Sequence, residues 1–292
     1  MSGASGLIGS ALLPALRADG HDLVRLVRRE PAGADEIRWD PSADELDAAQ
    51  LEGTDAIVNL SGENIGQRWT DARQREILES RTTTTGLLAR TASALDPRPS
   101  VFVCASAIGA YGDRGNEILT EESELGSGFV ADVARAWEAA ADTAREAGVR
   151  VVHLRQGIVL ADDGGALGRM RLPFKLGVGG RIGSGKQWFS WVGMEDIVGA
   201  YRRALSTDLS GPVNVTAPNP VTNEQFTKAL GSALSRPTIL PVPGFAIRML
   251  FGDMGDEMLL SGQRVLPAKL LDAGFEFAAP TIDVGLERAL AK

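Results

Sequence analysis

Short apolar runs alternate with longer amphipathic runs over the first two thirds of the chain. The apolar runs at 22–27, 54–62, 100–105 and 151–160 predict buried strands, and residues 36–39 predict a shorter one. The runs at 10–19, 71–95 and 131–146 interleave charged and apolar positions, which is typical of helices with one exposed face. Strands that alternate with helices predict an α/β fold built on a doubly wound parallel sheet.

A glycine-rich segment opens the chain, and the first expected helix follows it directly. Gly3, Gly6 and Gly9 have the spacing of the loop that binds a dinucleotide in a Rossmann domain. These glycines permit a tight turn, a close approach of backbone amides to pyrophosphate, and close packing of the helix on the sheet. The phosphate then lies at the positive end of the helix. A buried strand should precede the loop, but only Met1 and Ser2 do, so we expect a truncated first strand.

Two arginines, Arg28 and Arg29, end the second expected strand. In a Rossmann site this position borders the adenosine ribose, where an acidic residue favours NAD and arginines favour the 2′-phosphate of NADP. We therefore expect NADP(H) as the cofactor; the alternative is a pair of solvated surface arginines. The polar exit of the strand at 54–62 and one arginine of the helix at 71–95 complete the expected cofactor contacts: Gly3, Ser5, Gly6, Leu7, Ile8, Gly9, Arg28, Arg29, Asn59, Ser61, Gly62 and Arg81.

A hydroxyl and a phenol follow the strand at 100–105. Ser106 and Tyr111 come where the ends of parallel strands border a ligand crevice, so both are candidates to contact a substrate. Cys104 lies inside the apolar run itself. We expect it to be a small buried hydrophobic residue rather than a nucleophile.

The composition changes at residues 162–186, which are rich in glycine, arginine and lysine. This segment predicts a long loop that flanks an anionic or polar substrate. A strand at 187–192, a helix from Glu195 and a strand at 211–216 then return to the α/β pattern, and a capped helix begins at Thr222.

These changes suggest two structural parts. We assign residues 1–160 and 187–216 to an NADP-binding Rossmann domain, and residues 161–186 and 217–292 to a substrate loop and a smaller C-terminal lobe. Arg264 and Lys269, in this lobe, could face either the substrate cleft or solvent.

Composition excludes several classes of function. The 292 residues carry a net charge of −8, which argues against a general nucleic-acid surface. No apolar run is long enough to span a membrane and no signal peptide is evident, so we expect a cytoplasmic protein that does not bind membranes. One cysteine and two histidines provide neither a disulfide framework nor a Cys/His zinc site, and no metal is expected.

Taken together, the motifs resemble an atypical extended short-chain dehydrogenase/reductase of the NAD(P)-dependent epimerase/dehydratase family. The resemblance covers nearly the whole chain and is strongest for an uncharacterised epimerase-like subfamily with its own small C-terminal lobe. The segments that carry it are Gly3–Gly9, Asp55–Ile65, Ser106–Gly112, Gly183–Gly185 before Trp191, Glu195–Asp196 and Gly262–Pro267.

The chain departs from this superfamily at its acid/base pair. The resemblance implies a tyrosine followed four residues later by a lysine that lowers the tyrosine pKa. Residues 128–134, where the pair is expected, read GFVADVA and contain neither residue. Ser106 would then hold the substrate oxygen. Tyr111, which has Gly115 four residues later, is either a weak proton donor or a packing residue beside the cofactor.

The leading hypothesis is an NADP(H)-dependent oxidoreductase that transfers hydride to an unknown polar small molecule. The missing pair leaves a second hypothesis, an NADP(H)-binding sensor or interaction protein without catalysis. A third, a sugar-nucleotide epimerase or dehydratase, is disfavoured because oxidation of a sugar hydroxyl needs the absent base. We expect a monomer or a homodimer.

Overall fold

A parallel sheet forms the centre of the computed structural model, which describes residues 1–162 and 164–291. Its strands are ordered β11–β7–β5–β4, and each neighbouring pair is parallel. They are β4 (Ala56–Asn59), β5 (Val101–Ala107), β7 (Arg150–Gln156) and β11 (Gly211–Val215). Because helices cover both faces of the sheet, the central strands β5 and β7 are buried over most of their length and appear in the sequence as apolar runs.

Met1 and Ser2 connect this sheet to a smaller one. Ser2 forms a parallel bridge with Asn59, and the Leu26 N–H donates to the Met1 carbonyl at 2.8 Å. The smaller sheet consists of β1 (Arg25–Val27), β2 (Glu36–Asp40) and β3 (Glu45–Leu46), with β1 and β2 parallel and β3 antiparallel to β2. The expected strand before the glycine loop is thus represented by two residues between β1 and β4.

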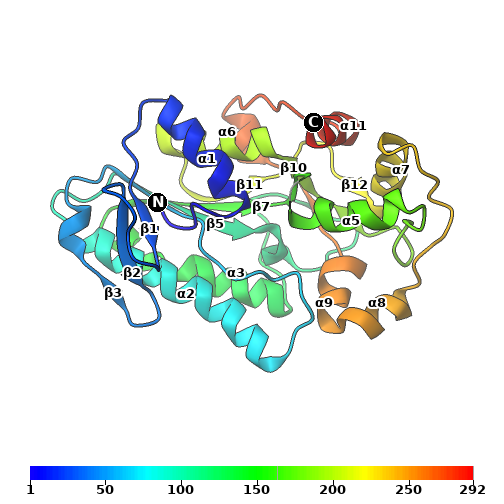
Figure 1. Ribbon diagram of the computed structural model, residues 1–292, viewed down its shortest axis with the longest axis horizontal. Helices are drawn as coiled ribbons and strands as arrows, with labels where there is room; N and C mark the ends of the chain where they lie inside the picture. The colour runs from blue at the N-terminus through cyan, green and yellow to red at the C-terminus, as the bar shows by residue number, and fades with distance from the viewer. Residues whose placement is uncertain (163, 292) are drawn as a thin grey trace.

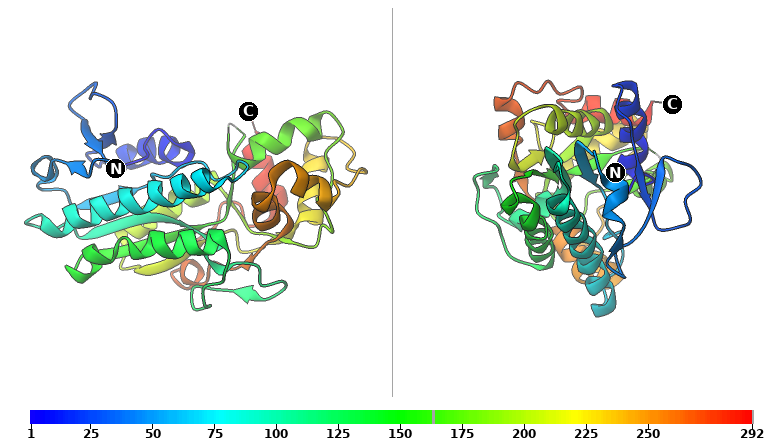
Figure 2. Two further views of the ribbon diagram at one scale, coloured as in Figure 1. Left: turned by 90° about the horizontal axis from the view of Figure 1, so that it is seen from below. Right: turned by 90° about the vertical axis from the view of Figure 1, so that its left-hand side faces the viewer.

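Helices cover both faces of the parallel sheet, which confirms the doubly wound architecture (Figures 1 and 2). On one face α1 (Leu7–Ala18) and α6 (Met194–Ser206) pack over Val103 and Val152. On the other face α2 (Asp71–Ala94) and α4 (Asp142–Glu146) pack over Phe102 and Cys104, with α3 (Phe129–Ala139) beside α2. Cys104 is buried, as expected, and burial raises the pKa of its thiol.

Three expected elements are each divided in two. The helix predicted at 131–146 is α3 and α4, separated at Ala140–Ala141. The strand predicted at 151–160 is β7 followed by β8 (Ile158–Leu160), which pairs with β10 (Trp191–Gly193). The chain changes direction at Gly157, where a Cβ atom would lie 2.8 Å from the Ser190 carbonyl oxygen. The strand predicted at 187–192 becomes β9 (Trp188–Phe189) and β10.

The prediction of a long loop at 162–186 was wrong. Its first half is the helix α5 (Gly165–Lys175). Leu167 and Phe174, two helical turns apart, are buried on one face, and their contacts stabilise a helix that the glycine content had obscured.

The C-terminal segment interlocks with the rest of the fold. β12 (Val221–Thr222) pairs with β9, and β13 (Arg264–Val265) pairs with β6 (Ile118–Leu119). Thr222 and Gln225 form the capping box at the start of the helix α7 (Asn223–Ala233). No helix in the described part of the chain is long and apolar enough to cross a membrane. The remaining elements are η1 (Ala48–Leu51), η2 (Ile108–Tyr111), α7 (Asn223–Ala233), α8 (Gly244–Phe251), α9 (Asp253–Gly255), the π-helix η3 (Asp256–Leu260), α10 (Ala268–Asp272) and α11 (Ile282–Leu290).

Two helical glycines should respond in opposite ways to alanine. A Cβ on Gly285 of α11 would lie 2.3 Å from the Trp191 ring, so Gly285→Ala should destabilise the fold by about 1–3 kcal/mol through overpacking. A Cβ on Gly86 of α2 would meet the end of the Arg90 side chain at 3.3 Å, which can move aside, and the Ala140 carbonyl oxygen at 3.9 Å, an ordinary van der Waals contact. Gly86→Ala should therefore raise stability by up to about 1 kcal/mol. Urea unfolding of both variants tests this, and a stabilised Gly285→Ala variant would contradict the packing.

Candidate functional site

The glycine-rich loop has the geometry of a dinucleotide cradle. Gly3 has a φ of +65°, and a Cβ there would lie 2.7 Å from the Leu60 backbone. A Cβ on Gly9 would lie 2.3 Å from the Gly3 carbonyl oxygen. Gly6 is the N-cap of α1, and no side chain of the described residues caps that end. The first-turn amides are therefore available to an anion such as pyrophosphate.

Asn59, a predicted cofactor contact, connects the segments around the glycine loop through buried hydrogen bonds. It is fully buried, and its Oδ1 accepts hydrogen bonds from the Ser2 hydroxyl at 2.6 Å and from the Ser61 N–H at 3.1 Å. Its Nδ2 donates to the Thr85 hydroxyl of α2 at 2.8 Å. Asn59 thus connects β4 to the start of the glycine loop, and its predicted contact with the cofactor stays a prediction.

Arg81 stiffens the loop that follows β4. Its guanidinium donates to the carbonyls of Ile77 and Glu63 at 2.9 and 3.1 Å and lies 4.9 Å from the centre of the Trp137 ring. Burial lowers the pKa of Arg81 to about 10, although the Glu63 carboxylate opposes this shift. A Cβ on Gly62 would lie 3.2 Å from this guanidinium. Arg81 therefore supports the loop at 61–63, and its predicted contact with the cofactor stays a prediction.

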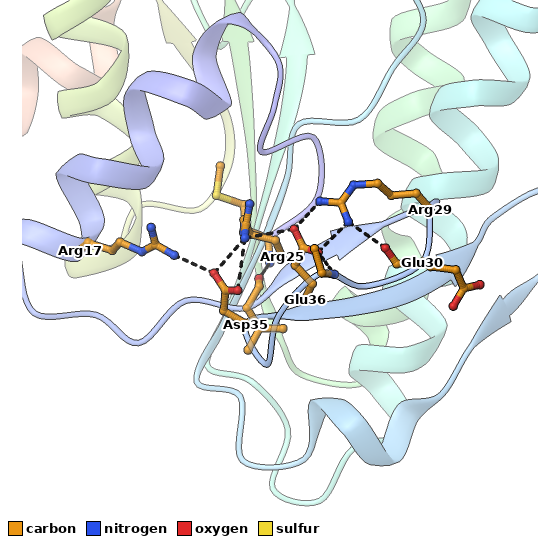
Figure 3. Close-up of polar contacts among 9 residues, drawn as sticks. Arg17, Arg25, Arg29, Glu30, Asp35 and Glu36 are labelled. Atoms are coloured by element: carbon orange, nitrogen blue, oxygen red, sulfur yellow. Dashed lines mark hydrogen bonds and ion pairs between the residues drawn. The ribbon is translucent and has the colours of Figure 1, made fainter.

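The two arginines after β1 differ in their surroundings, and Figure 3 shows those of Arg29. Arg29 forms two hydrogen bonds with the Glu36 carboxylate, at 2.6 and 2.8 Å, and Arg25 lies 3.0 Å from the same group. Arg29 is the largest influence that lowers the pKa of Glu36 to about 2, so the carboxylate stays ionised at neutral pH. Arg28 is exposed, and no ion pair joins it to another described residue. Of the two, Arg28 is the one free to bind a phosphate.

Ser106 lies at the end of β5 with 2% of its surface exposed. Its hydroxyl donates to Oε1 of Glu138, on α3, at 2.7 Å. Glu138 also accepts two hydrogen bonds, both of 2.8 Å, from the guanidinium of Arg155 on β7. The hydroxyl proton of Ser106 is therefore directed at a buried ion pair.

Tyr111, in η2, is fully buried. Its hydroxyl donates to Oδ1 of Asn214 at 2.7 Å and accepts a 3.0 Å hydrogen bond from Arg155. Asn214, on β11, donates in turn to the Leu266 carbonyl at 3.0 Å. These contacts favour the packing role for Tyr111 over the role of proton donor.

Charge is distributed in this network in a way that disfavours proton transfer by the phenol. Burial raises the pKa of Tyr111, and Arg155 and Asn214 offset this only in part. Burial also acts to raise the pKa of Glu138, but the hydrogen bonds and charge of Arg155 outweigh it and lower that pKa overall. The stability contributed by ionised Glu138 is therefore present at neutral pH, above the unfolded pKa of about 4.3, and is lost as the pH falls through the lower folded value.

The helix start that would carry the superfamily's acid/base pair is closed by the C-terminal segment. The Glu257 carboxylate, on η3, accepts hydrogen bonds from the Phe129 and Val130 N–H groups at 3.1 and 3.0 Å. The Trp69 ring packs edge-on against Phe129 at 4.8 Å. The start of α3 thus contacts Trp69 through an apolar side chain and the C-terminal segment through the Glu257 carboxylate.

The side chains of the other two candidates, Arg264 and Lys269, have partners outside this network. The Arg264 guanidinium stacks over the Trp188 ring at 4.4 Å, and the Lys269 ammonium donates to the Ser210 carbonyl at 3.1 Å. The described residues contain no cluster of three or more His, Cys, Asp or Glu side chains placed to hold a metal.

Glu138, Arg155, Asn214 and Glu257 were not predicted as site residues. Arg155 carried the one visible signal, because a charged residue inside the apolar run of β7 needs a buried partner. Nothing in the sequence identifies Glu138 as that partner.

Comparison with known proteins identifies the family. The model of the NAD dependent epimerase/dehydratase family matches residues 1–216, and a domain of unknown function matches residues 242–289. The chain belongs to the NAD dependent epimerase/dehydratase family. This confirms the resemblance found in the sequence.

Members of the family resemble the chain over nearly its full length. Epimerase family protein MT2273 of Mycobacterium tuberculosis is 45% identical over 100% of this chain and 97% of its own length. The crystal structure of human epimerase family protein SDR39U1 with NADPH has a TM-score of 0.87 and 34% identity, covering 99% and 97% of the two chains. A nucleoside-diphosphate sugar epimerase from Corynebacterium glutamicum has a TM-score of 0.83 and 36% identity, covering 99% of this chain and 57% of that protein.

Neither tyrosine of this family member should ionise at its usual pH. The chain has two tyrosines, Tyr111 and Tyr201, and burial raises the pKa of both. Absorbance titration of tyrosinate should give midpoints above the reference of about 10 in the native protein, and a midpoint near 10 in denaturant. A native tyrosine that ionises below pH 10 would show that a phenol is activated, as in the superfamily's usual mechanism.

Proposed function

We propose that this chain is an NADP(H)-dependent oxidoreductase that reduces a small molecule. The observation that carries the proposal is the turn formed by Gly3, Gly6 and Gly9. Cβ atoms on Gly3 and Gly9 would collide with the backbone of Leu60 and Gly3, so only glycine permits this tight turn, which brings the first-turn amides of α1 toward a pyrophosphate. The uncapped end of α1 supplies amides for the phosphates, and exposed Arg28 supplies charge for a 2′-phosphate. The NADPH in the human relative supports the same cofactor.

The surroundings of the candidate hydroxyls favour reduction over oxidation. When bound, NADPH supplies a hydride to an electrophilic carbon, and the carbonyl oxygen of the substrate then takes a proton. Oxidation would instead require a base that removes a proton from an alcohol. Burial raises the pKa of Tyr111, so the phenol stays protonated at neutral pH and cannot act as the base. The Ser106 hydroxyl already donates to Glu138. We infer that the proton for reduction comes from water that reaches the crevice.

A second function is favoured by the same buried network. Both candidate catalytic hydroxyls have their hydrogen atoms bonded to other residues of the protein, to Glu138 and Asn214. A protein that senses NADP(H) needs the cofactor cradle but no proton donor. The two functions differ in one measurable respect, which is whether bound NADPH is consumed.

Arg28 should set the preference for NADPH over NADH. Arg28→Ala should weaken NADPH binding roughly tenfold or more, the equivalent of one charge-assisted hydrogen bond of about 1.5–3 kcal/mol, and leave NADH binding unchanged. Arg29→Ala should have a smaller effect, because Arg29 is paired with Glu36. Calorimetric titration with both cofactors tests this, with Arg75→Ala on the exposed side of α2 as the matched control. Equal affinity of the unmodified protein for NADPH and NADH would reject the assignment.

Turnover, once a substrate is found, should run toward reduction. NADP⁺-driven alcohol oxidation at pH 7 should be about 100-fold or more slower than NADPH-driven reduction, because neither Ser106 nor Tyr111 is available as a general base. The measurement is a screen of carbonyl compounds by NADPH absorbance, followed by rates in both directions. Gly9→Val, which should lose the cofactor cradle, is the control for non-enzymatic oxidation. Efficient oxidation at pH 7 would defeat the proposed direction, and tight NADPH binding with no reduced compound would favour the sensor.

A further inference from the structure

Exposed apolar side chains gather in two stretches of the chain. Of the twelve large hydrophobic residues that the described part of the chain exposes, eight lie within 172–178 and 239–250. Their exposed fractions run from 54% to 82%. Isolated exposed hydrophobic residues are ordinary, but a contiguous group usually marks an interaction surface. The eight residues are Leu172, Leu176, Val178, Ile239, Leu240, Phe245, Met249 and Leu250.

The two stretches lie side by side, and we call the exposed residues of both together the apolar-basic face. The Gly183 N–H donates to the Val242 carbonyl and the Val242 N–H donates to the Arg181 carbonyl, each at 2.8 Å. The Arg236 side chain donates to the Lys175 carbonyl at 2.9 Å. Figures 1 and 2 show α5, α8 and the segment between α7 and α8 at the end of the molecule away from β1–β3.

The charge of this face is opposite to that of the rest of the protein. Residues 168–186 and 236–250 contain seven arginines or lysines and no acidic residue. The whole chain carries −8, so the remaining residues carry −15. Arg171 and Arg248 are paired with Asp162 and Asp256 outside these stretches. Five cations stay without an ion pair to any described residue: Arg169, Lys175, Arg181, Lys186 and Arg236.

We propose that the apolar-basic face binds the surface of a membrane rich in anionic lipid. Apolar side chains that enter the boundary between headgroups and acyl chains, ringed by Arg and Lys, are the features of a protein that lies on a bilayer. Attachment of this kind needs no spanning helix. The proposal therefore replaces the expectation, drawn from the lack of an apolar run of spanning length, that the protein does not bind membranes. The remaining −15 would be repelled by anionic lipid, so electrostatics alone would orient this face toward the membrane.

A second copy of the chain fits the face less well. In a symmetric dimer the same patch meets itself, so five unpaired cations would face five others across an interface with no acidic residue in either stretch. Repulsion between these like charges disfavours association of two copies of the chain. The same charges favour phosphate-bearing lipid.

Flotation with lipid vesicles tests the proposal on the full chain. The protein should float with vesicles of phosphatidylcholine and phosphatidylglycerol at about three to one, at about 0.1 M salt, and should not float with phosphatidylcholine alone. Phe245→Ser should reduce partitioning about tenfold or more by removing an inserted ring. Lys175→Ala should reduce it about fivefold, as expected for one basic residue near an anionic surface.

Matched controls separate the face from general surface effects. Leu271→Ser removes an exposed apolar side chain from α10, and Arg75→Ala removes an exposed cation from α2; both should leave partitioning unchanged. Thermal melting checks that each variant is folded. Absence of flotation, equal flotation with both vesicle types, or unchanged flotation of Phe245→Ser and Lys175→Ala would each overturn the proposal. So would a dimer in sedimentation that Phe245→Ser dissociates, since the face would then bind a second copy.

Discussion

The buried ion pair between Glu138 and Arg155 is the interaction on which the interior of the fold depends. The two side chains are 13% and 5% exposed, and the guanidinium fork meets both carboxylate oxygens. Leaving either charge in place without the other would cost about 3–5 kcal/mol, because the remaining charge could not return to water. The pair joins α3 to β7, and through Ser106 it also holds the end of β5.

The same pair decides what chemistry the interior can perform. Arg155 donates to Tyr111 and Glu138 accepts from Ser106, so both candidate catalytic hydroxyls are partners of the ion pair. A tyrosine that takes part in hydride transfer is useful when a nearby cation lowers its pKa and leaves it open to substrate. Arg155 supplies the cation here, but the effect of burial on the pKa of Tyr111 is larger than the effect of Arg155, so the pKa is raised. The contacts that stabilise the interior therefore also engage the hydrogen atoms of both hydroxyls.

The fold was predictable from the sequence because its main elements have local sequence patterns. The strands β5 and β7 are apolar runs, and the loop before α1 needs glycine for steric reasons that operate within a few residues. The burial of Ser106 and Tyr111 depends instead on contacts with residues 32 and 103 positions away. Long-range pairing of this kind leaves no periodic signal in the sequence. The helix α5 was missed because its segment is rich in glycine, and the contact between residues 168–186 and 236–250 is also long-range.

Apolar residues at the start of α3, in place of the expected acid/base pair, help to hold the C-terminal segment. The resemblance to the superfamily implies a tyrosine and a lysine at the start of the helix corresponding to α3; in this chain that segment contains Phe129, Val130 and Val133. Val133 packs with Trp69 and Met254, and Glu257 satisfies the Phe129 and Val130 amides that begin the helix. Because a helix start carries partial positive charge, one carboxylate completes both the hydrogen bonding and the electrostatics of this contact. Restoring the tyrosine and lysine would place two polar side chains in this apolar contact, so the position of the C-terminal segment and the absence of the pair are parts of one arrangement.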